Sequence, residues 1–197
     1  MRKIKIDFEN ITDKCEKAIN SSEYNELIKK VKNAKKIYLL GNGGLHYVSS
    51  HMATDMTRLI PDKVAFSYDS VGFITSSAND FGFNELYVRW LETIAGIEDS
   101  SQCLVVGMSC SGNSANVVKA LHWSYERNFE TFMISGQKSE ILNYKISELN
   151  LNCEYFHTVE VLSMMIFYDL IHQTDNKCPS IRGEKNRMKN SDLRAIV

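Results

Sequence analysis

Residues 36–44 read KIYLLGNGG, an apolar run that passes directly into a glycine-rich turn, and a helical pattern follows over 45–59. Residues 103–114 read CLVVGMSCSGNS, where an apolar run again leads into a turn and then into a helical pattern, over 114–128. A strand that ends in such a turn and opens a helix presents backbone N–H groups and the positive end of a helix dipole to one place. Because both turns belong at the carboxyl edge of one sheet, they predict a joint site for a phosphorylated small molecule.

The rest of the chain continues this alternation. Further strand candidates are residues 64–68, 131–135 and a shorter run at 151–155, and further helical patterns cover 84–97 and 158–173. Near-continuous apolarity is expected of strands that are covered on both faces. The alternation therefore predicts an α/β fold with a doubly wound, five-stranded parallel sheet flanked by helices.

The two ends of the chain differ from this alternating part. From residue 6 to about 34, apolar residues recur at three- and four-residue steps, which predicts an N-terminal amphipathic helical arm. Ser21 and Ser22 are expected to divide the arm into two helices. Towards the C-terminus Lys, Arg, Asn and Ser predominate. We expect one domain over 1–175, arm included, and a polar tail over 176–197 that is either mobile or docked on a partner.

The overall charge argues against two classes of partner. The formal net charge of −1 provides no long-range attraction for nucleic acid or for an anionic membrane, so neither is expected. No apolar run reaches the length of a signal peptide or of a membrane-spanning helix. We therefore expect a cytoplasmic protein.

The five cysteines are odd in number, widely spaced and without a Cys-x-x-Cys pair. This pattern argues against a disulfide framework and against a thiolate zinc site. Cys110 differs from the others because it lies inside the second turn, where N–H groups and a helix N-terminus are expected to lower its pKa. Two interpretations stay open for Cys110: a nucleophile, or a small residue that fills a tight loop.

The turns do not match the common nucleotide-binding motifs. The first turn lacks the G-x-G-x-x-G spacing, and no Gly-Lys-Ser/Thr follows the second turn. The second turn instead offers three hydroxyls and several backbone donors without a fixed positive charge. We interpret both turns as parts of a phosphate cradle. The alternative for the second turn is a polar loop with a helix cap at Asn113 or Ser114.

Two polar groupings outside the turns are candidates for chemistry. His51 and Asp55 are four residues apart on the helix after the first turn, so both project from one face. They suit a metal pair or an acid–base pair, and a surface hydrogen bond is the alternative. Residues 79–84 (NDFGFN) form an Asx-rich turn that suits binding to sugar hydroxyls or, alternatively, capping of the next helix. Three further polar side chains lie near the ends of the last helical pattern: His157, Glu160 and His172.

Taken together, these motifs resemble the sedoheptulose 7-phosphate isomerases (phosphoheptose isomerases) of the sugar isomerase (SIS) superfamily. The resemblance rests on residues 41–44, His51, residues 79–84 and residues 109–120, and it covers about residues 6–173 in the same order. It implies a SIS-like domain and a homotetramer with active sites between subunits. It also implies an aldose–ketose isomerisation that makes a heptose phosphate for surface polysaccharide such as lipopolysaccharide.

The same resemblance assigns residues to the site. The residues that it places along the substrate are Asn42, Gly43 and Gly44, with Asn79 and Asp80 at the hydroxyls. Those that it places around the phosphate are Ser109, Cys110, Ser111 and Ser114. It implies that His51 and Asp55 serve as catalytic groups and as zinc ligands, although the family has a glutamate at the position of Asp55.

The chain departs from the family pattern on the last helix. With Glu160 as the anchor, the glutamine and the histidine of the family correspond to Val159 and Phe167, which neither bind zinc nor transfer protons. His51 and Asp55 are then too few ligands for a tight zinc site. Three hypotheses follow: an isomerase of sedoheptulose 7-phosphate, an isomerase of another sugar phosphate, and a non-catalytic module that binds a sugar phosphate or acts as a scaffold.

Overall fold

The computed structural model describes residues 4–95 and 100–180. Its centre is a five-stranded sheet in the order β2-β1-β3-β4-β5, in which every neighbouring pair is parallel. The strands are β1 (Lys36–Leu40), β2 (Val64–Ser67), β3 (Cys103–Ser109), β4 (Glu130–Ser135) and β5 (Ser147–Asn150). The predicted α/β fold with a five-stranded parallel sheet is confirmed.

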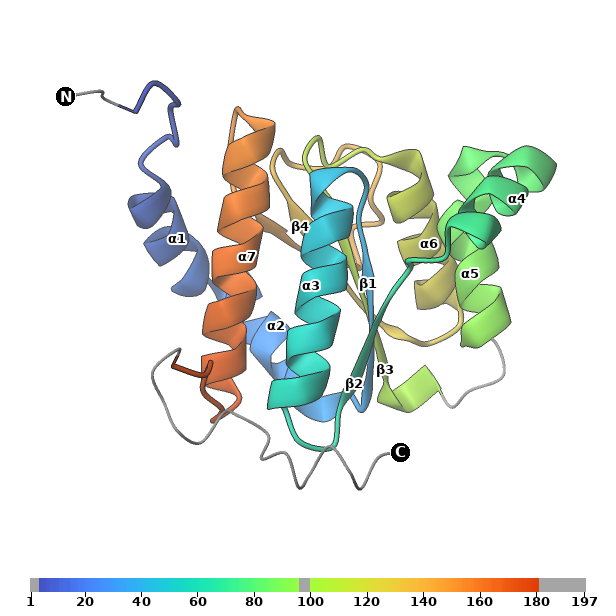
Figure 1. The fold of residues 1–197 in the computed structure, drawn as a ribbon, viewed down its shortest axis with the longest axis horizontal. Coiled ribbons are helices and arrows are strands. Elements are labelled where there is room, and N and C mark those ends of the chain that lie inside the picture. Colours follow the sequence, from blue (N-terminus) through green and yellow to red (C-terminus); the bar gives the residue numbers. More distant parts are fainter. Residues whose placement is uncertain (1–3, 96–99, 181–197) are drawn as a thin grey trace.

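Helices cover both faces of this sheet (Figure 1). The α-helices are α1 (Ile11–Ile19), α2 (Ser22–Asn33), α3 (Gly44–Leu59), α4 (Val71–Phe81), α5 (Leu86–Ile94), α6 (Ala115–Glu126) and α7 (Phe156–Gln173). Two short 3-10 helices are η1 (Phe83–Glu85) and η2 (Ser100–Gln102). One face of the sheet packs against α1, α2, α3 and α7, and the other packs against α5 and α6, with α4 beside α5.

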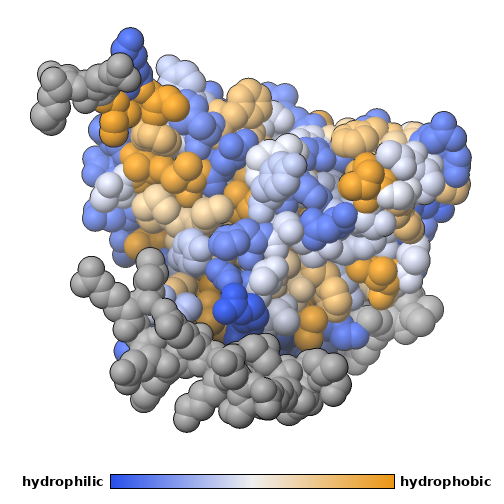
Figure 2. All heavy atoms as spheres, in the orientation of Figure 1, coloured by the Kyte–Doolittle hydropathy of each residue, from blue (hydrophilic) through white to orange (hydrophobic). Residues whose placement is uncertain are grey.

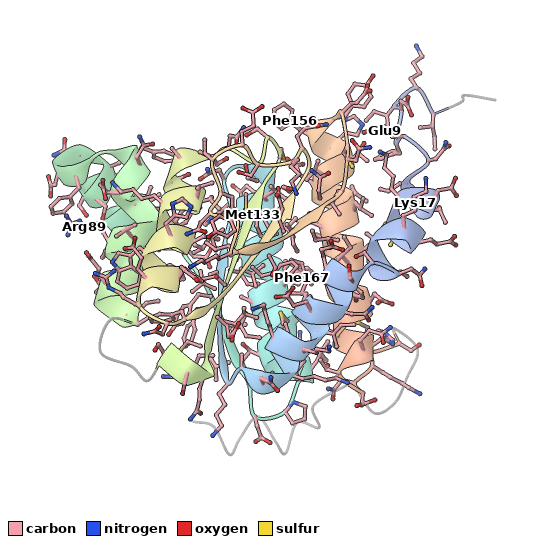
Figure 3. All side chains as sticks on the ribbon, turned by 180° about the vertical axis from the view of Figure 1, so that it is seen from behind. Glu9, Lys17, Arg89, Met133, Phe156 and Phe167 are labelled. Carbon is pink, nitrogen blue, oxygen red and sulfur yellow. The ribbon has the colours of Figure 1, made fainter. Side chains whose placement is uncertain are left out.

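Strand β1 shows how one run of sequence serves both cores. Ile37 and Leu39 join the apolar cluster beneath α3 and α7, whereas Tyr38 and Leu40 join the cluster beneath α5 and α6. All four side chains are buried, which is why the strand reads as a continuous apolar run. Figure 3 shows Phe167 in the interior on the α7 side of the sheet.

The N-terminal arm divides where the serine pair predicts. Helix α1 ends at Ile19, and the Ser21 hydroxyl accepts a hydrogen bond from the Tyr24 amide at 3.1 Å, which caps the start of α2. Tyr24 is buried, and its hydroxyl donates to the Asp169 carboxylate of α7 at 2.6 Å. The arm is therefore fixed to the domain by both apolar packing and a charged hydrogen bond.

The predicted position of the fifth strand is wrong. Strand β5 precedes the apolar run 151–155 and is the edge strand, so it pairs with β4 alone. Of its side chains only Leu149 is buried, and its sequence therefore lacks the apolar signal of a central strand. The apolar run forms a coil whose Leu151 and Cys153 side chains are buried against the core.

The structure also differs from the prediction for residues 79–84. Helix α4 continues through Asn79 and Asp80, so both lie in a helix and not in the predicted turn. The chain turns at Gly82, whose φ of 87° favours glycine. The predicted helix 84–97 consists of η1 and α5, and its last two residues lie outside the described residues, as does the part of the predicted tail from residue 181 onward.

The carboxyl ends of the five parallel strands meet at one edge of the sheet, at the top of Figure 1. Helices α3, α6 and α7 begin there. Because β1 and β3 are neighbours in the sheet, the turns that follow them lie side by side. Within the described ranges, none of the helices combines the length and apolar character needed to cross a membrane.

Candidate functional site

The turns after β1 and β3 line one cavity of about 260 Å³. The first turn contributes Asn42, Gly43, Gly44 and Leu45, and the second contributes Ser109, Cys110, Ser111 and Ser114. Met108, Phe156 and Glu160 complete the lining. The two turns therefore meet at one place, and we call the space between them the turn cavity.

The first turn leaves amide donors beside this cavity. Gly43 is the N-cap of α3 and has a φ of 58°, a conformation that glycine adopts without strain. The amides of Leu45 and His46 donate to the carbonyls of Asn42 and Gly43, at 3.1 and 3.0 Å. Within the described part of the chain, the amides of Gly43 and Gly44 have no acceptor. They are available to an anion at the start of α3.

The second turn gathers hydroxyls at the start of α6. The hydroxyls of Ser109 and Ser114 are 2.9 Å apart, and the Ser109 hydroxyl also accepts from the Ser114 amide at 3.3 Å. The Ser111 hydroxyl accepts from the Asn113 amide at 3.2 Å. Ser114 occupies the N-cap position but makes no side-chain capping bond. Its hydroxyl is therefore directed to the turn and not to the helix end.

A reciprocal amide pair holds the two turns together. The side chains of Asn42 and Asn116 donate to each other at 2.8 and 2.9 Å, and Asn116 is buried. The Tyr87 hydroxyl donates to the carbonyl of Gly41 and, at 3.3 Å, to the side-chain oxygen of Asn42. The Asn42 side chain thus fixes the cavity wall. The sequence carries no local signal for the roles of Asn116 and Tyr87, because their partners come from other elements.

Two glycines allow the second turn to contact the segment after β4. Gly136 and Gln137 donate their amides to the carbonyls of Ser109 and Cys110, both at 3.0 Å. A Cβ atom on Gly112, which has a φ of 73°, would lie 2.3 Å from the Gln137 carbonyl oxygen. On Gly136 it would lie 2.4 Å from the Cys110 carbonyl oxygen. Glycine is therefore required at both positions for this turn to keep its shape.

The predicted lowering of the Cys110 pKa is wrong. Burial raises the pKa of this thiol to about 11, and the nearby charge of Glu160 adds to the effect. A neutral thiol is a poor nucleophile. The structure therefore favours the interpretation of Cys110 as a small residue that fills the turn.

Asn79 and Asp80 lie away from the turn cavity. Both are exposed, and the Asn79 side chain donates to the Asp80 carboxylate at 2.8 Å. Neither lines the turn cavity or the smaller hollow of about 150 Å³ on the other side of the first turn. Their contact with sugar hydroxyls stays a prediction.

His51 and Asp55 form the predicted pair on α3. Their Nε2 and Oδ2 atoms are 3.5 Å apart, and His51 Nε2 is also 2.8 Å from the Tyr168 hydroxyl. The other oxygen of Asp55 is 3.7 Å from the Arg58 guanidinium. His51 lines a separate hollow of about 710 Å³ between α3 and α7. Neither residue lines the turn cavity.

The pair does not fit a resident zinc ion by itself. Zinc sites in proteins use three or four side-chain ligands, and residues 4–95 and 100–180 contain no cluster of three His, Cys, Asp or Glu side chains that could hold a metal. Val159 and Phe167, at the positions where the resemblance would place a glutamine and a histidine, are buried apolar residues of the core. They provide no ligand, and zinc binding by His51 and Asp55 stays a prediction.

Glu160 is the functional candidate that sequence analysis left unassigned. It lies in the second turn of α7 and is half-buried, and it lines both the turn cavity and the hollow between α3 and α7. A Cβ atom on Gly44 would be 2.2 Å from its carboxylate, so the acid packs directly on the start of α3. The glycine pair 43–44 and an acid on the last helix were visible in the sequence, but their contact was not.

Comparison with known proteins agrees with the fold. No family model matches the sequence. The phosphoheptose isomerase of Buchnera aphidicola (strain Tuc7) is 26% identical over 146 residues, which are 71% of this chain and 74% of the relative. That of Escherichia coli O7:K1 is 33% identical over 110 residues, 54% of this chain and 55% of the relative. The structure of the phosphoheptose isomerase from Neisseria gonorrhoeae superposes with a TM-score of 0.75 at 20% identity, over 85% of this chain and 92% of that one. The resemblance to the phosphoheptose isomerase family is confirmed.

Proposed function

We propose that this chain, a relative of the phosphoheptose isomerases, is an aldose–ketose isomerase of sugar phosphates, with sedoheptulose 7-phosphate as the first candidate substrate. The names of its relatives support this reaction class. The single observation that carries the proposal is that two glycine- and serine-rich turns, from neighbouring strands, line one cavity. The product would be a heptose phosphate used for surface polysaccharide.

The chemistry of the turn cavity suits a phosphate monoester. Its polar lining includes serine hydroxyls and the free amides of Gly43 and Gly44, together with Asn42 and, at one side, Glu160, and α3 and α6 both begin beside it. Oriented amides and helix N-termini bind phosphate without a cationic side chain. Among the described lining residues there is no lysine or arginine. We therefore place the phosphate group between the two turns.

The isomerisation needs a group that moves a proton between adjacent carbons and a group that polarises the carbonyl. His51 and Asp55 are the groups that the resemblance implies, and their pairing on α3 supports a shared role. Because they do not line the turn cavity of their own chain, we propose that they act at the far end of the sugar or in a site between subunits.

Assembly into a homotetramer is part of this proposal. Large apolar side chains are exposed around the α3–α7 face: Tyr47 is 75% exposed, Phe156 72% and Val161 42%. Figure 2 shows apolar residues gathered over α7 and the segment that leads into α1. Size-exclusion chromatography with light scattering tests the assembly directly, and a monomer at micromolar concentration would contradict it.

The enzymatic proposal is tested by incubating the purified protein with sedoheptulose 7-phosphate, with and without zinc or a chelator, and detecting the aldose by NMR. Thermal shift with the same ligand measures binding separately. Ser111→Ala should weaken binding about tenfold or more, because a hydrogen bond to a charged group is worth about 1.5–3 kcal/mol. Ser76→Ala, on the exposed side of α4, is the matched control. Binding without turnover under every condition would favour the non-catalytic module instead.

A further inference from the structure

We propose that the Tyr168 hydroxyl takes the place of a metal ion at the His51–Asp55 pair, so that the pair belongs to a hydrogen-bonded network that holds no zinc. The starting observation is that Tyr168, on α7, reaches α3, where its hydroxyl oxygen is 2.8 Å from His51 Nε2. The network itself is independent of the proposed function. Its consequence for catalysis, that Tyr168 is a positioning residue for His51, rests on the proposed function.

The nitrogen that Tyr168 contacts is the one that a shared metal ion would use. His51 Nε2 and Asp55 Oδ2 are 3.5 Å apart. Two ligands of one tetrahedral zinc ion are about 3.4 Å apart, because each lies about 2.0–2.2 Å from the metal. An ion shared by this pair would therefore bind Nε2, but the Tyr168 hydroxyl already lies within hydrogen-bond distance of that atom. Because a tyrosine hydroxyl is not among the common zinc ligands, zinc would have to break this contact to enter the pair.

The surroundings of Asp55 also disfavour a metal ion. Its Oδ1 atom is 3.7 Å from the Arg58 guanidinium, three residues further along α3. A fixed positive charge at one oxygen repels a divalent cation at the other. The charge of Asp55 also acts on the Tyr168 hydroxyl, so Tyr168, His51 and Asp55 form one network. The chain itself therefore supplies the partners of this carboxylate.

The position of Tyr168 on α7 explains why a hydroxyl and not an imidazole reaches the pair. Phe167, where the resemblance would place a histidine, is fully buried in the core, and Tyr168 is partly buried at the edge of the same core. Neighbouring residues of a helix point about 100° apart, so the two side chains occupy different places. The rings of Tyr168 and His51 also meet edge to face, with centroids 6.2 Å apart and an interplanar angle of 75°. The ring contact and the hydrogen bond together fix the orientation of the imidazole.

For the proposed isomerisation, this network makes Tyr168 a positioning residue. The His51 side chain is 49% exposed and lines the hollow between α3 and α7, so packing alone does not fix its ring. Within the described ranges its other ring nitrogen, Nδ1, has no hydrogen-bond partner and is available to a ligand. A catalytic group displaced by about 1 Å can lose about 100-fold in rate. Loss of the Tyr168 hydroxyl should therefore lower kcat more than it changes binding.

Zinc binding is tested first, without an assay of activity. The chelator-treated wild type and His51→Ala are titrated with zinc chloride while Tm is measured. A zinc site filled at about 100 times its Kd should raise Tm by roughly 5–11 °C in a chain of this size, and we expect less than about 1 °C in the wild type. A larger rise that His51→Ala abolishes would overturn the proposal. An equal rise in both chains would place the ion elsewhere and leave the pair free of zinc, as proposed.

Nitrogen NMR of the His51 ring tests the hydrogen bond itself. The spectra compare the wild type with Tyr168→Phe and with the control Tyr144→Phe, whose ring is 90% exposed between β4 and β5. Phenylalanine keeps the ring and its packing and removes only the hydroxyl. We expect Tyr168→Phe, but not Tyr144→Phe, to shift the Nε2 resonance of His51. An unchanged resonance in Tyr168→Phe would overturn the network.

The catalytic consequence is tested with sedoheptulose 7-phosphate. We expect turnover that a chelator leaves unchanged, and Tyr168→Phe should lower kcat by about tenfold to 100-fold with KM within about threefold, whereas Tyr144→Phe should match the wild type. If the wild type turns over and Tyr168→Phe keeps its kcat, the positioning role is overturned. If the wild type turns over no sugar phosphate, the proposed function fails, while the zinc titration and the NMR spectra still decide on the network.

Discussion

Replacement of Gly112 tests whether the shape of the second turn depends on its contact with the segment after β4. Gly112 has a φ of 73°, and an added Cβ would lie 2.3 Å from the Gln137 carbonyl oxygen and 2.9 Å from the Ser139 amide. Both neighbours are backbone, so the turn itself must move. Backbone strain costs about 1–3 kcal/mol, and overpacking adds about 1–3 kcal/mol. We expect Gly112→Ala to lower the free energy of unfolding by about 2–6 kcal/mol.

The matched control is Gly82→Ala, because Gly82 has a φ of 87° but nothing within 4 Å of an added Cβ. Gly82→Ala therefore introduces the backbone strain of a positive φ but no steric clash with neighbouring atoms. The two variants should therefore differ by about 1–3 kcal/mol, roughly 2–12 °C in Tm for a chain of this size. Urea unfolding and calorimetry measure the difference, and thermal shift with a sugar phosphate should show loss of binding in Gly112→Ala. Equal destabilisation of the two variants would refute the claim that backbone contact shapes the turn.

The remaining predictions concern the arm, the buried thiol and the last helix. Ser21→Ala should lower the free energy of unfolding by about 1 kcal/mol in urea titrations, because it removes the acceptor of the Tyr24 amide at the start of α2. Cys110, with its pKa raised to about 11, should be alkylated at least about tenfold more slowly at pH 8 than the same cysteine in the urea-unfolded chain. Its alkylation rate should rise as the pH approaches 11. Mass spectrometry measures both rates, and equal rates in the folded and unfolded chains would contradict the burial of the thiol. The double variant Val159→Gln/Phe167→His should lose about 1–3 kcal/mol or more in free energy of unfolding, because both sites are buried among apolar side chains. A zinc-dependent rise in the Tm of this variant, absent from the wild type, would show that α3 and α7 can still form a metal site.

Several parts of this protein could be predicted because their signals are local. Strand β1 and the turn 41–44 follow one another in the chain, and the apolar run and the glycines determine strand and turn without help from distant residues. The division of the arm at Ser21 is equally local, since a serine needs only the amide three residues later to cap a helix.

Other parts depended on contacts that no local pattern records. Strand β5 has one buried side chain because it forms the edge of the sheet, so its sequence resembles a loop. The pKa of Cys110 was expected to fall at a helix N-terminus. It rises because the thiol is partly buried and an acid from α7, fifty residues later in the chain, lies beside it.

The sequence by itself determined the alternation of strands and helices and the two polar turns, because each depends on residues that are neighbours along the chain. Only the tertiary structure decided that Asn116 holds Asn42, that Gly44 receives the carboxylate of Glu160 and that His51 lies outside the turn cavity. The physical reason is that burial and electrostatic neighbours are set by packing between elements distant in sequence, and these determine which side chains can reach a ligand.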